Sequence, residues 1–140
     1  MIYKLMLEKG HIRVKDIAES LNISPPSVVD FLEKLSKEGL IVYEKGGKIE
    51  LTEKGLSIGK ALHERHEALK KFLILLLRID EERAERETCY IEHGISEKTL
   101  ERIVRFIKFI EKCGHEVPLK FLEHLYKYYE SGEEEITCPS

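Results

Sequence analysis

Four side chains that can bind a metal ion fall on one face of a helix predicted to run from Asp80 to about His93. Each residue of an α-helix advances by about 100°, so one quadrant of its surface carries Cys89, Glu92, His93 and Glu85. Thiolate, carboxylate and imidazole donors at this spacing suit a first-row transition metal better than calcium or magnesium. The alternative is a buried free cysteine beside a solvated Glu-His pair.

A second group of donors lies on the preceding predicted helix, in the segment from His63 to Glu67. Neighbouring helices joined by a short loop usually pack antiparallel, so His66 can reach the face that carries Cys89. The segment is not the HExxH motif of zinc proteases, because only one residue separates Glu64 from His66. We therefore predict a metal site without hydrolytic activity.

Residues 61–140, which carry these donors, are predicted to be almost entirely helical. Thr52 can cap a long helix that runs to about Leu77, while Asp80 and Ser96 can cap the next two. A last helix follows Pro118, and the acidic tail from about residue 131 is expected to fray. The apolar stripes of these helices exceed what one small bundle can bury, so we predict a homodimer.

Residues 1–60 begin with three predicted helices. A first helix ends at Gly10, and the apolar spacing of Val14–Leu21 predicts a second. Ser24 is a good N-cap and Pro25 suits the first position of a third helix that ends before Gly39. The short turn between the second and third helices is typical of a helix-turn-helix.

A predicted β-hairpin follows these helices. Its strands, residues 40–45 and 48–51, are expected to be joined by the two-residue loop Gly46-Gly47, since paired glycines allow the positive φ angles of a primed turn. Helices followed by a hairpin indicate a winged helix-turn-helix that binds DNA. The alternative is a small α+β domain without a ligand.

Side chains of the third helix and the hairpin are candidates for contact with double-stranded operator DNA. Serine hydroxyls can bond phosphates or base edges, proline and valine can touch a thymine methyl, and aspartate can accept from cytosine. Basic residues beside the glycine turn and at the start of the second helix can contact phosphates, although a lysine there can equally be a solvated surface charge. The candidates are Ser24, Pro26, Ser27, Val29, Asp30, Arg13, Lys45 and Lys48.

The composition is that of an ordinary globular protein, with 140 residues, 42% hydrophobic and 35% charged. A net charge of −3 speaks against nonspecific coating of nucleic acid, but it allows binding through a locally basic face. The longest apolar run, Phe72–Leu77, is far shorter than the roughly 20 residues that span a bilayer. We expect a cytoplasmic protein without membrane contact, and its three cysteines argue against a disulfide framework.

Several of these segments occur in the same order in the diphtheria-toxin-repressor family of metal-dependent transcriptional regulators. The chain resembles this family over about residues 2–112, through Val14–Leu21, Ser24–Val28, Leu51–Gly55, Arg65–Glu67 and Cys89–His93. The resemblance implies a mainly α fold, with a winged helix-turn-helix DNA-binding domain at 1–60 and an all-helical metal-binding and dimerisation domain at 61–140. It also implies a homodimeric repressor that binds its operator more tightly with Fe²⁺ or Mn²⁺. We expect no SH3-like domain within 140 residues.

The resemblance also implies roles for individual residues. Cys89, Glu92 and His93 resemble the ligands of the family's primary metal site, and His66 resembles the histidine of the neighbouring site. Cysteine at this position is similar to the iron-responsive branch, whereas the manganese-responsive branch has a carboxylate there. Because a thiolate is the softer donor, it favours Fe²⁺, with Mn²⁺ as the alternative.

Three features depart from the family pattern. Lys70 stands where the family has a carboxylate, and Glu85 stands where the iron-type members have histidine. The family also draws ligands from its first helix, at positions that would precede Met1 in this numbering. These differences affect chiefly the second metal site.

Two other functions agree with the residues alone. In the first, the protein is a metal-independent winged-helix regulator that has Cys89 as a redox sensor or a pocket for a small organic ligand. Peroxide or thiol alkylation would then control its affinity for DNA. In the second, the donor cluster belongs to a metal-handling enzyme. Since neither a nucleophile nor a Gly-rich phosphate loop is visible, we predict that the protein is not an enzyme.

Overall fold

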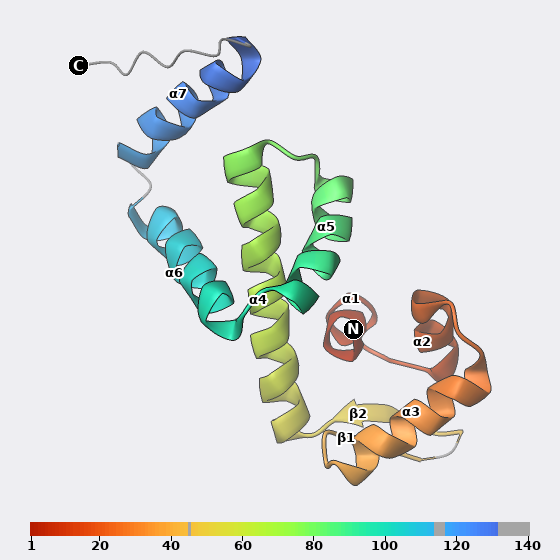
Figure 1. The fold of residues 1–140 in the computed structure, drawn as a ribbon. Coiled ribbons are helices and arrows are strands. Elements are labelled where there is room, and N and C mark those ends of the chain that lie inside the picture. The colour runs from red at the N-terminus through yellow and green to blue at the C-terminus, as the bar shows by residue number, and fades with distance from the viewer. Residues whose placement is uncertain (45, 114–116, 132–140) are drawn as a thin grey trace. The chain divides into compact units, whose positions relative to one another are not determined.

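The computed structural model describes residues 1–44, 46–113 and 117–131, which form seven helices and one two-stranded sheet (Figure 1). The predicted mainly α fold class is confirmed. Two compact units divide the chain, residues 1–63 and 64–140, and the boundary falls within α4. The elements are α1 (Ile2–Lys9), α2 (Val14–Leu21), α3 (Pro25–Lys37), β1 (Ile41–Tyr43), β2 (Ile49–Leu51), α4 (Glu53–Leu77), α5 (Glu81–Gly94), α6 (Glu97–Cys113) and α7 (Val117–Ser131).

The first unit is built around an apolar core to which α1, α2, α3 and the hairpin contribute. Val28 and Leu32 are four residues apart on the inner face of α3, and both are fully buried. Ile17 from α2 is also fully buried, and Ile41 and Ile49 bring the inner face of the hairpin to the same core. α3 lies alongside this hairpin (Figure 1). The core holds the helix-turn-helix and its wing together.

Local signals set the turn between α2 and α3. Asn22 ends α2 in the left-handed region, with a φ of 52°, which asparagine tolerates better than most residues. The Ser24 hydroxyl accepts a hydrogen bond from the Ser27 amide at 3.4 Å, and Pro25 occupies the first helical position. The predicted cap and start of the third helix are therefore confirmed.

The hairpin differs from its prediction. Tyr43 pairs with Ile49 and Ile41 with Leu51, whereas a two-residue Gly46-Gly47 loop would pair Tyr43 with Glu50. The predicted loop is therefore wrong by one residue of register. The observed pairing puts Ile41 and Ile49 on the core side together, and a slip by one residue would send one of them to the opposite face. The turn is closed instead by a bond from the Gly47 amide to the Glu44 carbonyl at 2.7 Å.

The start of α4 is hydrogen-bonded to the segment that directly follows α3. The Thr52 hydroxyl donates to the Gly39 carbonyl at 2.7 Å and accepts from the Gly55 amide at 3.1 Å, so the predicted Thr52 cap is confirmed. The backbones approach so closely that a Cβ on Gly55 would lie 1.8 Å from the Leu40 carbonyl oxygen. Only glycine fits at this contact within the first unit.

The second unit comprises the rest of α4 together with α5, α6 and α7. Leu69, Leu73, Ala84 and Ile107 are among its buried apolar residues. The predicted caps of α5 and α6 are confirmed, because Asp80 accepts from the Arg83 amide and Ser96 from the Thr99 amide. The acidic tail expected to fray from about residue 131 lies, apart from Ser131, outside the described residues. Within the described residues, no helix is long and apolar enough to cross a bilayer.

Tyrosine hydroxyls from α7 donate hydrogen bonds to backbone carbonyls at the end of α4. Tyr126 donates to the Leu75 carbonyl at 2.6 Å and Tyr129 to the Leu76 carbonyl at 2.7 Å. The last carbonyls of a helix have no partner within it, so these bonds supply what the helix end lacks. Arg78 adds a contact over the Tyr126 ring, 4.3 Å from its centroid. These contacts join α7 to α4 within the second unit.

Candidate metal centre and nucleic-acid interface

A polar cluster lies between α4 and α5 of the second unit. His66, Glu67 and Glu85 each offer a metal-ligand atom, and these atoms all lie within 4.8 Å of one another. His66 and Glu85 were predicted to be metal ligands, while Glu67 was not. Contacts pair Lys70 with Glu85 and His66 with Glu92, so α4 and α5 run antiparallel here, as predicted.

His66 lies between two carboxylates. Its Nδ1 is 3.2 Å from a Glu92 oxygen, its Nε2 is 3.3 Å from a Glu85 oxygen, and its side chain is 17% exposed. A neutral imidazole has only one N–H, so it can donate to only one of these carboxylates. The other nitrogen then presents a lone pair to a negative charge, unless the ring is protonated or a cation lies there. The donor types and their charge therefore fit a divalent transition metal.

Lys70 is the cation that the structure puts beside this cluster. Its Nζ lies 3.1 Å from Glu85 and 3.2 Å from Glu67, and its side chain is only 14% exposed. Burial lowers the pKa of Lys70, but hydrogen bonds to Glu85 and Glu67 outweigh this effect and leave the pKa above its ordinary value. Lys70 is therefore an ammonium ion that neutralises part of the carboxylate charge.

Cys89 and His93 are both exposed on α5. Glu92, from the same helix, is half-buried and reaches His66. Neither Cys89 nor His93 belongs to a group of three or more close metal donors in the part of the chain that the structure describes. The structure thus brings together His66, Glu85 and Glu92, and it leaves the thiol and the second imidazole open to solvent. The assignment of Cys89 and His93 as ligands stays a prediction.

Glu67 and Lys70 were not identified as site residues from the sequence. Glu67 directly follows His66, and Lys70 is three residues after Glu67. This spacing puts opposite charges side by side on a helix and could have indicated the pair. It could not have indicated Glu85 as the second partner, because that contact depends on how α5 packs against α4.

Four of the eight predicted DNA contacts are exposed to solvent at the start of α3. Ser24, Pro26, Ser27 and Asp30 are exposed, while Val29 is half-buried. The two serine hydroxyls are 2.9 Å apart, so each is partly engaged by the other. The assignment of these residues as DNA contacts stays a prediction.

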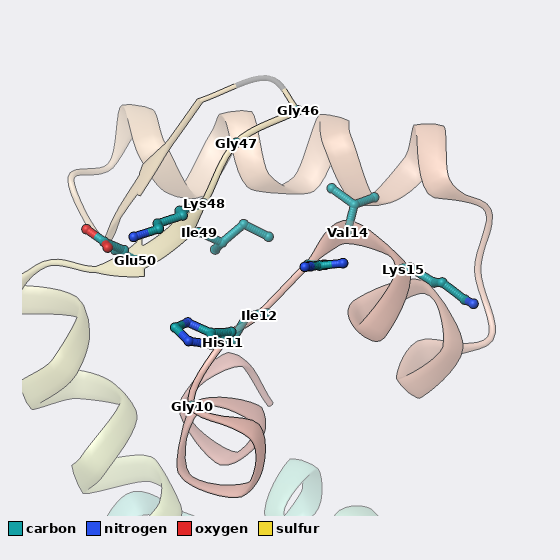
Figure 2. Close-up of a pocket in the computed structure, with 11 residues that line it drawn as sticks. Gly10, His11, Ile12, Val14, Lys15, Gly46, Gly47, Lys48, Ile49 and Glu50 are labelled. Carbon is teal, nitrogen blue, oxygen red and sulfur yellow. The ribbon is translucent and has the colours of Figure 1, made fainter.

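Two further predicted contacts line a groove in the first unit, and Figure 2 shows the two segments that form it. It has a volume of about 680 Å³ and is lined by the segment Gly10–Lys15 and by the wing segment Gly46–Glu50. Arg13 and Lys48 both line it, as do His11 and Lys15, so its walls carry more basic than acidic side chains. Lys45, also predicted to contact DNA, lies outside the described residues.

Comparison with known proteins identifies the family of both units. The model of the iron-dependent repressor N-terminal DNA-binding domain matches residues 1–48, and that of the metal-binding and dimerisation domain matches residues 52–119. The HTH-type transcriptional regulator MntR of Geobacillus kaustophilus is 40% identical over 132 residues, covering 94% of this chain and 92% of the relative. MntR of Bacillus subtilis is 41% identical over 111 residues, covering 79% of this chain and 78% of the relative.

Solved structures agree with this relationship. IdeR of T. acidophilum matches with a TM-score of 0.63 and 30% identity, covering 79% of this chain and 49% of that one. The manganese-activated repressor ScaR matches with a TM-score of 0.63 and 29% identity, covering 77% of this chain and 51% of that one. The chain thus spans about half the length of these two structures. It belongs to the diphtheria-toxin-repressor family and is a metal-dependent transcriptional repressor.

Proposed function

We propose that Fe²⁺ activates this repressor, with Mn²⁺ as the alternative ion, through a site made by Cys89, Glu92, His93 and His66. The observation that carries the proposal is the position of His66, which faces Glu92 through one ring nitrogen and Glu85 through the other. A histidine that binds a metal through one nitrogen usually donates its other N–H to a carboxylate, which fixes the ring. Glu85 is suited to this orienting role and Glu92 to the role of ligand.

The choice of ion depends on Cys89. A thiolate is softer than a carboxylate and favours Fe²⁺ over Mn²⁺. The relatives named MntR and the manganese-activated repressor ScaR favour Mn²⁺ instead. We therefore expect Cys89→Glu to raise the response to Mn²⁺ relative to the response to Fe²⁺. A ranking of the two ions that is the same in the variant and the wild type would contradict this role of Cys89.

The DNA partner is proposed to be a double-stranded operator bound by a homodimer. The exposed residues Ser24, Pro26, Ser27 and Asp30 at the start of α3, with Val29 beside them, would face the base edges. Arg13 and Lys48, which line one groove, would contact the phosphate backbone together with Lys45. Two copies related by a twofold axis would present two α3 helices to a palindromic site.

Metal activation follows from differential binding. An ion that binds the DNA-competent arrangement more tightly than the other arrangements raises the population of the competent one. The donors come from α4 and α5, so they restrict how these two helices can move. Exposed Cys89 and His93 are accessible to an ion arriving from solvent.

Anaerobic fluorescence anisotropy tests this function. Duplex DNA from the region upstream of the gene is titrated with the protein in chelator, Fe²⁺ or Mn²⁺ at fixed salt, because phosphate contacts make the affinity salt-dependent. Wild-type protein should bind more tightly with metal. Cys89→Ala and His93→Ala should remain dimeric and lose the stimulation by metal, whereas His124→Ala, at an exposed position on α7, should keep it.

Two outcomes would overturn the proposal. If both Cys89→Ala and His93→Ala respond to metal like the wild type, the ligand assignment is wrong. If the wild type binds DNA equally in chelator and in both metals, metal activation is absent under these conditions. The exposed free thiol of Cys89 would then favour redox regulation, which peroxide treatment in place of metal would reveal.

A further inference from the structure

The group formed by His66, Glu67 and Glu85 already holds a cation of its own, the Lys70 ammonium. Its Nζ contacts one oxygen of Glu85 at 3.1 Å and one of Glu67 at 3.2 Å. An ammonium group is a compact point charge with three donors, so it can join two carboxylates as a divalent ion does. The side chain is 14% exposed, so solvent screens this contact only in part.

The Lys70 contact matters because it offsets the negative charge of the carboxylates around His66. Glu67, Glu85 and Glu92 bring three carboxylates to the surroundings of His66, and like charges this close disfavour the packing of α4 against α5. Lys70 comes from α4 and its partner Glu85 from α5, so the ammonium both offsets charge and bridges the two helices. A divalent ion held by Glu67 and Glu85 would need the same carboxylates and would lie against the Lys70 charge.

We propose that the Lys70 ammonium takes the place of a divalent cation between Glu67 and Glu85, so that this contact joins α4 to α5 without metal. The chain then binds a single activating ion per subunit. This count rests on the proposed function, which assigns that ion to Cys89, Glu92, His93 and His66. The replacement at Lys70 does not rest on it, because it follows from the contacts of Lys70 alone.

Counting bound Mn²⁺ by isothermal titration calorimetry, together with electron paramagnetic resonance of the free ion, tests the proposal. Wild-type protein should bind about one ion per chain, and Lys70→Gln should bind about two, because the variant removes the ammonium group from between the two carboxylates. Lys70→Arg keeps the charge and should still bind one. Lys71→Gln is the matched control, since Lys71 is the next residue on α4 and pairs with Glu111 outside the cluster.

Thermal unfolding is a second measurement that tests the proposal even if Lys70→Gln is less stable than the wild type. In chelator this variant should unfold at a lower temperature than the wild type, and Mn²⁺ should raise its unfolding temperature by more than it raises that of the wild type. A wild type that binds two ions would overturn the proposal. So would a Lys70→Gln variant that binds as many ions as the wild type, with the same affinity.

A second set of variants separates this proposal from the ligand assignment. Cys89→Ala combined with His93→Ala should abolish Mn²⁺ binding, and adding Lys70→Gln to that pair should restore about one ion per chain. If the pair binds Mn²⁺ like the wild type, the assignment of Cys89 and His93 fails, while a gain on adding Lys70→Gln still supports the role of Lys70. If the pair binds none and the triple variant also binds none, the role of Lys70 fails.

Discussion

Different interactions hold the functional elements together within each of the two units of this repressor. In the first unit, nine buried apolar residues hold the helix-turn-helix and the wing together. In the second, the contact between α4 and α5 adds a half-buried group of charges around His66 and Lys70. Apolar burial is non-directional and independent of ions, whereas a charge cluster depends on which cation is present. We therefore expect the fold of the first unit to be independent of metal, and sensitivity to cations to be concentrated between α4 and α5.

The largest effect should come from a close contact in the first unit. Gly55→Ala would put a Cβ 1.8 Å from the Leu40 carbonyl oxygen, so the backbone must shift. We expect a loss of about 3 kcal/mol or more in the free energy of unfolding, measured in urea. Gly94→Ala at the end of α5 is the control, because a Cβ there meets nothing within 4 Å. Equal stability of the two variants would contradict the close packing of α4 against the end of α3.

A smaller effect is expected from the charge cluster of the second unit. Glu85→Gln removes the carboxylate charge that contacts both Lys70 and His66, and it should cost about 1.5 kcal/mol in chelator, an effect that high salt reduces. Glu82→Gln changes a pair with Arg86 on the same helix, in which the Glu82 side chain is 85% exposed, and should cost less than about 0.5 kcal/mol. Urea unfolding at two salt concentrations measures both. Similar losses of stability in the two variants would mean that the cluster behaves like an ordinary surface ion pair.

A substitution in the turn of the helix-turn-helix should change the free energy of unfolding by about the cost of one residue held in a strained backbone conformation. Asn22 has a φ of 52°, so Asn22→Ala should lower stability by about 1 kcal/mol, while Asn22→Gly should stay near the wild type. Neither effect should change with Fe²⁺, Mn²⁺ or chelator. A metal-dependent effect at this position would contradict the expectation that the stability of the first unit is independent of metal.

The smallest effect concerns a surface ion pair of the first unit. The hydrogen bond from Lys9, at 2.6 Å, and a second from the Arg13 amide hold the pKa of Asp16 below its ordinary value of 3.8. Because the folded-state pKa is the lower one, this stabilisation is complete above the unfolded pKa and is lost as the pH falls through the lowered value. An NMR titration of the Asp16 carboxyl should show the shift. In Lys9→Met the pKa should move back towards 3.8.

Local signals in the sequence were sufficient for the helices and for most of their ends. Thr52, Asp80 and Ser96 each cap the helix they were predicted to cap, because a capping bond joins residues only three apart. The same holds for Ser24 and Pro25 at the start of α3. The family could likewise be recognised, because several of its characteristic segments occur in the same order along this chain.

Contacts between distant segments were decided by the tertiary structure. The hairpin register depended on bringing Ile41 and Ile49 to one core, which the glycines of the loop do not encode. Glu85 meets His66 and Lys70 only because α5 packs antiparallel to α4 with a particular rotation. Helical spacing determines which residues share a face, and only the packing of one helix on another determines which partner that face meets.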